Sequence, residues 1–132
     1  MITQEKAFKA YAALKKLSDV PMAFSKAKVI FDLKQKLQPC WDFQTQEEQK
    51  IFDMYPDLDV QTMTINLEGK DEEARKKALE DSKEIDQKLR ELGKMDSGFE
   101  ETEPVKLVLS DDPRITISAK DIEYLSTFVE IS

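Results

Sequence analysis

The sequence has no histidine, one cysteine and only three glycines among its 132 residues. Without histidine, every His-dependent catalytic triad and most zinc sites are excluded. The lone Cys40 excludes an internal disulfide and a thiolate cluster, and beside Trp41 it is expected to pack rather than react. Three glycines are too few for a glycine-rich phosphate-binding loop. We therefore expect no enzyme activity, no cofactor and no metal site.

Long apolar runs are also missing. The longest is five residues, 10–14, whereas a membrane-spanning helix needs about 20. Lys6, Lys9, Lys15 and Lys16 interrupt the apolar stretch that a signal peptide requires. We therefore expect a cytoplasmic protein of the host cell without membrane contacts, and association with a virion is left open.

The net charge is −7, and residues 94–132 alone carry nine acidic and four basic groups. This acidic third would be repelled by phosphate backbones, so direct nucleic-acid binding is disfavoured and a basic protein surface suits it better. With 36% charged and 40% hydrophobic residues, the chain has the composition of a folded, helix-rich protein. Its length predicts a single domain over residues 1–132.

Residues 1–56 are predicted to be helical. Thr3 can cap a first helix over 4–17, and Val20-Pro21 separates it from a second helix over 21–38, giving a helical hairpin. Pro39 ends or kinks the second helix, and whether the helix is continuous through it is left open. The apolar residues expected in the core are Ala7, Tyr11, Leu14 and Leu17 in the first helix, and Ala23, Phe24, Ala27, Ile30, Phe31, Leu33 and Leu37 in the second.

The middle of the chain changes its pattern twice. Residues 58–68 alternate apolar and polar side chains with a period of two, which predicts a strand. Residues 71–92 form a long helix capped by Asp71 and ended by Gly93, with apolar positions spaced 4, 3, 4, 3 as in a coiled coil. This seam packs on the N-terminal hairpin or, as the alternative, forms a homodimer. Its positions are Ala78, Ser82, Ile85, Leu89 and Leu92.

The C-terminal part is predicted to begin with an acidic loop over 94–104. A β-hairpin with strands 105–109 and 114–117 follows, and Ser118 with Asp121 has the spacing of a capping box that starts a terminal helix. The predicted fold class is α+β, with an N-terminal helical hairpin and a long central helix packed with a small, mostly antiparallel sheet.

Two adjacent aspartates, Asp111 and Asp112, precede Pro113 between the two expected strands. A carboxylate pair that moves protons needs a pocket that separates the two pKa values, whereas aspartate and proline are both favoured in tight turns. We therefore interpret the pair as a turn. Ser25 and Lys28 have the S-x-x-K spacing of some serine enzymes, but they lie near the start of an amphipathic helix and the companion motifs are missing.

A calcium-loop pattern also occurs. Asp57, Asp59, Gln61 and Glu68 occupy its first, third, fifth and twelfth positions, but the glycine required at the sixth is Thr62. We expect no metal to bind here.

Two groups of residues are candidates for partner contact. Trp41 and Phe43 lie in the part of the chain richest in aromatic residues, and such clusters either anchor partners or pack in the core. The second group consists of acidic residues that could imitate phosphates, namely Glu100, Glu101, Glu103, Asp111 and Asp112.

The stretches "ALKKLSDVPMAFSKAKVIFDLKQKLQP" and "VKLVLSDDPRITISAKDIEYL" resemble short proteins encoded by tailed phages and prophages. The resemblance implies an opening helix, a proline-started second helix, a charged helix and a final strand before an S/T-x-x-D helix start. That group has no assigned activity, so no residue role follows from it. The favoured function is a non-catalytic phage or prophage assembly or protein-interaction protein; the alternative is a small acidic inhibitor that mimics nucleic acid on a basic host protein.

Overall fold

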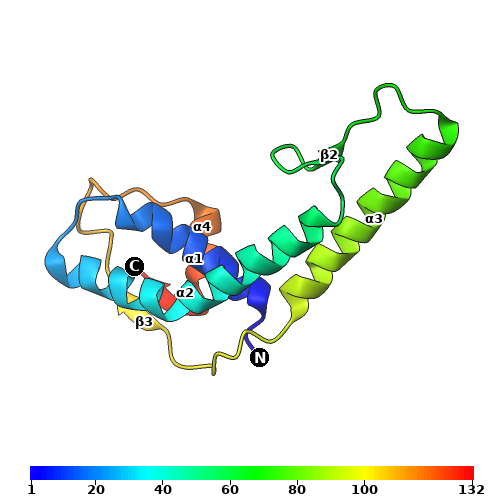
Figure 1. The fold of residues 1–132 in the computed structure, drawn as a ribbon. Helices are drawn as coiled ribbons and strands as arrows, with labels where there is room; N and C mark the ends of the chain where they lie inside the picture. The colour runs from blue at the N-terminus through cyan, green and yellow to red at the C-terminus, as the bar shows by residue number, and fades with distance from the viewer.

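A computed structural model describes all residues, 1–132, and divides visibly into a body and an arm (Figure 1). We use "arm" for residues 44–94 and "body" for the rest. The body contains α1 (Gln4–Ser18), the first two-thirds of α2 (Phe24–Asp53), β3 (Val105–Leu107), α4 (Ala119–Leu125) and β4 (Val129–Ile131). The arm contains the end of α2, β1 (Leu58–Asp59), β2 (Thr64–Ile65) and α3 (Glu72–Lys94). None of the four helices combines the length and apolarity needed to cross a membrane.

Helix α1 is the centre of the body. The Thr3 hydroxyl accepts a hydrogen bond from the Lys6 amide at 3.3 Å, which confirms the predicted N-terminal cap. Leu14 is fully buried, and α1 contacts α2, α3 and α4. The core around it contains Ala7, Ala10, Tyr11, Ala13, Leu14, Leu17, Ile30, Leu33, Leu37, Cys40, Leu107, Leu109, Leu125 and Val129.

Helix α2 is one continuous helix of 30 residues that passes through Pro39. Proline lacks the amide hydrogen that would bond one turn back, and the exposed position of Pro39 leaves the freed carbonyl open to water. The helix begins at Phe24 rather than at the predicted Pro21, and the residue before it, Ala23, provides no side-chain cap. Thr45 lies inside the helix, where its hydroxyl donates to the carbonyl of Trp41 at 3.0 Å.

The expected core face of α2 is only partly correct. Ile30, Leu33 and Leu37 are buried. Phe24 and Phe31, predicted to widen this face, are instead 82% and 52% exposed. Phe31 lies at the edge of the α1 contact, where it lines a groove with Leu17 and Ser18, and both phenylalanines are surface residues.

The C-terminal segment contains a parallel strand pair, and the predicted β-hairpin over 105–117 is wrong. β3 pairs with β4 in parallel, with Val105 opposite Val129, and residues 114–117 form no strand. They belong to the crossover that leads through α4 to β4. The α+β class is confirmed, and its sheets are this parallel pair and the antiparallel pair β1–β2.

Helix α3 packs along its own chain. The Asp71 carboxylate accepts a hydrogen bond from the Ala74 amide at 2.8 Å, confirming the predicted cap. Ala78, Ile85 and Leu92 of the seam are buried, and α3 contacts α1, α2 and β2. A homodimer through this helix would therefore have to use its opposite, charged face.

Gly93 does not end α3, which continues to Lys94. A Cβ atom added at Gly93 would lie 3.2 Å from the Cβ of Glu5, so the glycine lets α3 approach α1 closely. Just beyond the helix, the Met95 carbonyl accepts a hydrogen bond from the Gln4 amide at 2.7 Å. The base of the arm is thus fixed to the start of α1.

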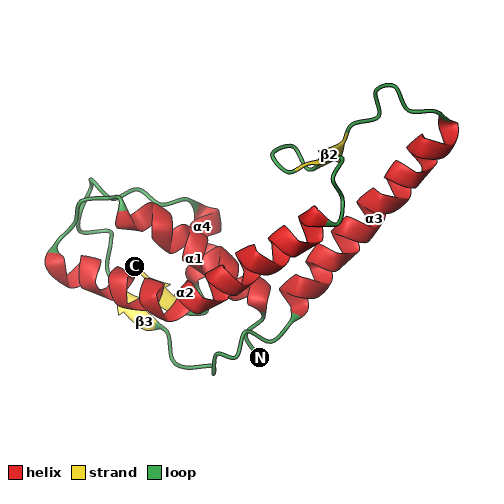
Figure 2. Ribbon diagram, viewed as in Figure 1, coloured by secondary structure: helices red, strands yellow, loops and turns green.

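The outer end of the arm has little regular structure (Figure 2). Within the predicted strand 58–68, only 58–59 and 64–65 pair, antiparallel to each other. Met63 has a positive φ of 55°, which reverses the chain between them. The alternating pattern therefore marks a short hairpin rather than one strand.

Candidate functional site

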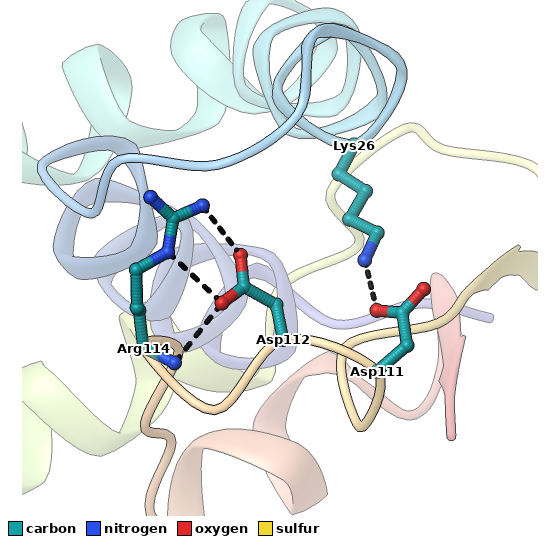
Figure 3. A network of polar contacts seen from close by, with 4 residues as sticks. All are labelled: Lys26, Asp111, Asp112 and Arg114. Atoms are coloured by element: carbon teal, nitrogen blue, oxygen red, sulfur yellow. Dashed lines mark hydrogen bonds and ion pairs between the residues drawn. The ribbon is translucent and has the colours of Figure 1, made fainter.

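The two adjacent aspartates point to different cations (Figure 3). Asp111 forms an ion pair with Lys26 of α2. Asp112 accepts hydrogen bonds from the Arg114 guanidinium at 2.9 and 3.0 Å and from the Arg114 amide at 3.0 Å. The Arg114 side chain, and secondly its amide, lower the pKa of Asp112 from 3.8 to about 2. An ionised, paired carboxylate of this kind organises a turn and is unsuited to proton transfer.

The acidic loop before β3 is only partly free. The Glu101 carboxylate lies 3.0 Å from the Met1 amino group, and this hydrogen bond lowers the pKa of Glu101. Glu100 and Glu103 are exposed and form no ion pair. Three of the five acidic residues predicted to imitate phosphates therefore already contact cations of their own chain: Glu101, Asp111 and Asp112. This pairing weakens the case for a nucleic-acid mimic.

The residues of the calcium-loop pattern do not converge. Asp57 pairs with Lys70 at 3.0 Å, and Asp59 accepts a hydrogen bond from the Gln61 amide at 3.0 Å. No three Cys, Asp or Glu side chains anywhere in the chain are grouped closely enough to hold a metal ion. In the S-x-x-K pair, Ser25 is exposed and Lys28 pairs with Asp32 at 2.8 Å.

Of the two aromatic candidates, Trp41 packs at the edge of the core. Its ring is stacked on Phe8, with centroids 4.5 Å apart, and the Tyr11 ring lies 4.8 Å away. The Lys15 ammonium lies 4.7 Å from the Trp41 ring centroid, which makes a cation–π contact. Phe43 is separate from this cluster and 40% exposed.

Cys40 is buried at the centre of α2, where burial raises the pKa of its thiol. Its sulfur lies 3.6 Å from the Ser97 carbonyl. A protonated, buried thiol is a poor nucleophile, so this cysteine has a packing role.

An open pocket of about 320 Å³ lies where α1, α2 and α3 meet. The buried Gln44 contributes to its wall: its amide nitrogen donates to Glu48 at 3.0 Å, while its amide oxygen has no partner. Glu5 and Lys9, also in the wall, pair at 2.8 Å, and this contact raises the pKa of Lys9. No serine, threonine or cysteine side chain lines the pocket.

An apolar groove of about 250 Å³ separates the end of α1 from the start of α2. Phe24 lies one turn before Ala27 on the same side of α2, outside the groove lining, and is 82% exposed. We call this surface the α1–α2 groove; it is lined by Leu17, Ser18, Val20, Met22, Ala27, Ile30, Phe31 and Lys34.

A second set of exposed apolar side chains lies in the arm, on the end of α2, the β1–β2 hairpin, the loop before α3 and α3 itself. It is next to a pocket of about 220 Å³ between the end of α2, β2 and α3. The Tyr55 hydroxyl connects the end of α2 to α3: it donates a hydrogen bond to Glu84 at 2.9 Å and accepts one from Lys88 at 3.0 Å. We call the surface the arm tip; its exposed apolar residues are Met54, Val60, Met63, Leu67 and Leu79.

Both apolar surfaces are missed by the sequence patterns. Phe24 and Phe31 have the helical spacing of core residues, and the pattern does not show which side of a helix faces α1. Leu79 was detectable, because it is the one leucine of α3 outside the 4, 3, 4, 3 seam.

Comparison with protein-family models found no match, and no curated protein or solved structure is significantly similar to the chain.

Proposed function

We propose that the protein is a non-catalytic interaction protein, of the phage or prophage assembly type, and that the arm tip contacts its protein partner. The observation that carries the proposal is the group of exposed apolar side chains on the arm tip. Met54 and Leu79 are 61% and 60% exposed, and Val60, Met63 and Leu67 are 38–48% exposed. These five exposed apolar side chains come from one part of the chain, residues 54–79, and apolar surface of this kind is typical of binding sites where it is contiguous.

The chemistry of the arm tip suits protein contact. Methionine is flexible and polarizable, so Met54 and Met63 can adapt to the shape of a partner. The arm projects from the body along α2 and α3, which leaves its outer residues accessible (Figure 1). The resemblance to short tailed-phage proteins suggests the setting, a phage or prophage assembly.

The polar groups favour a non-catalytic role. Asp111, Asp112, Asp57 and Glu101 are each paired with a cation of the same chain. Surface ion pairs of this kind are common structural contacts.

Site-specific photo-crosslinking in infected or induced cells tests the proposal. A benzophenone amino acid at Met63 is expected to capture one defined partner. The same amino acid at Phe43, in the part of α2 that belongs to the body, is expected to capture no partner. The double variant Met63→Ser/Leu79→Ser should lose that partner in a pull-down. Capture that is equal at Met63 and Phe43, or retained by the double variant, would contradict the proposal.

A further inference from the structure

The α1–α2 groove has the shape of a binding site for a helix. Ala27, Ile30, Phe31 and Lys34 follow one another at i, i+3, i+4 and i+7, so one wall is a single face of α2. Leu17 and the linker residues Val20 and Met22 form the opposite wall. An amphipathic helix binds such a groove through apolar residues with the same spacing.

The apolar surface continues beyond the groove. Phe24 is 82% exposed and Phe31 is 52% exposed, the two most exposed aromatic side chains of the chain. Both belong to the stripe of α2 that contains Ala27. Burying two phenylalanine side chains of this size supplies a large share of the binding free energy in many interfaces.

The charge around the groove is opposite to that of the whole protein. Residues 15–36 contain six lysines and two aspartates, a net charge of +4, and the ion pairs of Lys16 with Asp121 and of Lys26 with Asp111 reduce this to +2 in a protein whose net charge is −7. Lys34 in the groove wall forms no ion pair, and its ammonium reaches only the Ser18 hydroxyl at 3.5 Å. Lys28 lies 5.5 Å from the Phe31 ring centroid. An acidic partner would be attracted here.

The start of α2 adds to this preference. Its N-terminal residue Ala23 offers no capping oxygen, and the first turn contains no acidic side chain. The amide groups at a helix start carry partial positive charge and favour an acidic group nearby. A carboxylate of the bound partner could supply the missing cap.

We propose that the α1–α2 groove binds an acidic amphipathic helix of a partner protein. The apolar residues of that helix pack on Phe24 and Phe31, and its flanking carboxylates face Lys34 and the uncapped start of α2. This surface is at the opposite end of α2 from the arm tip, so the inference does not rest on the function proposed above.

Binding of designed peptides tests the proposal on the full chain. The probe is an 18-residue amphipathic helix with leucines at i, i+3, i+4 and i+7 and flanking glutamates, with a lysine-flanked peptide and a leucine-scrambled acidic peptide as controls. Amide chemical shifts should move at residues 17–34 with the first peptide only. Equal shifts with the lysine-flanked peptide, shifts confined to other residues, or no shifts would overturn the proposal.

Variants sharpen the test. Phe31→Ser is expected to weaken binding about tenfold or more, as for a central interface aromatic. Lys34→Glu should weaken it about two- to fivefold and reverse the preference toward the lysine-flanked peptide. The matched control Phe43→Ser, a 40% exposed phenylalanine on the same helix, should bind as the parent does. Concentration-dependent dimers that Phe24→Ser abolishes would show that a second copy covers the groove, which would also overturn the proposal.

Discussion

The body and the arm are built from similar helices but differ in how they are held. The body has a contiguous core of 14 buried residues, with Leu14, Ile30, Leu37 and Leu125 essentially inaccessible. In the arm, buried apolar residues are few: Tyr55, Ala78, Ile85 and Leu92. Since hydrophobic burial is the main source of stability, the body should determine global folding and the arm should open locally.

The body and the arm also differ in the surroundings of their exposed apolar side chains. Exposed Phe24 and Phe31 lie on the rigid body beside a formed groove. Exposed Met54 and Met63 lie on the arm tip, where short strands and turns leave the backbone weakly fixed. The groove is therefore suited to one defined shape and the tip to an adaptable contact.

The largest expected effect is in the body core. Leu14→Ala should lower the free energy of unfolding by about 2–5 kcal/mol, because it leaves a cavity at a fully buried site. Leu79→Ala, at a 60% exposed site of the arm, should change it by about 0.5 kcal/mol at most. Urea unfolding followed by circular dichroism measures both. Equal effects would show that the arm is as tightly packed as the body.

The junction of arm and body is the next most sensitive place. Gly93→Val should destabilise the protein by about 1–3 kcal/mol, because the new side chain would press on Glu5 of α1. The control Glu91→Val changes an exposed position of the same helix and should have a much smaller effect. Thermal unfolding compares the two variants. A neutral Gly93→Val would mean that α3 can move away from α1 freely.

A smaller effect is expected inside the arm. Tyr55→Phe removes the hydroxyl that contacts Glu84 and Lys88, which should lower stability by about 1 kcal/mol. Hydrogen exchange should become faster in residues 72–90 while the amides of α1 keep their protection. The control Tyr124→Phe on α4 should leave exchange in the arm unchanged. Faster exchange throughout the chain would show that body and arm unfold together.

The smallest effect concerns the ion pairs on the surface of the body. An NMR titration should give a pKa of about 2 for Asp112, and Arg114→Ala should raise it toward 3.8. Because the folded pKa is below the unfolded value, this carboxylate favours the folded state above pH 3.8 and loses that contribution as pH falls through about 2. Arg90→Ala on the arm is the control and should leave the pKa of Asp112 in place. An Asp112 pKa near 3.8 in the parent protein would contradict the pairing.

Local signals predicted the local parts of this fold. The caps at Thr3 and Asp71 and three of the five seam positions of α3 were correct, because each depends on residues within one or two turns. The hairpin over 105–117 was wrong, because β3 pairs with residues 129–131 and alternation does not identify a distant partner strand. Gly93 was misassigned for the same reason, since its role depends on Glu5, far away in the sequence.

The candidate site was predicted less well than the fold. Asp111 and Asp112 lie in a turn, as the chemistry of proline and aspartate predicted, but the second strand expected after the turn does not form. Trp41 and Phe43 were proposed as one cluster, but only Trp41 joins the aromatic packing around Phe8. Which apolar residues remain exposed depends on how α2 is rotated against α1, and that rotation is a property of the packed body.

The continuity of α2 through Pro39 has a geometric consequence. Phe24 and Met54 mark the two ends of this one helix, and 30 residues at 1.5 Å each give it a length of about 45 Å. If one protein binds at each end, the length of α2 sets the distance between the two bound proteins. One helical turn of α2 corresponds to about 5 Å of that spacing.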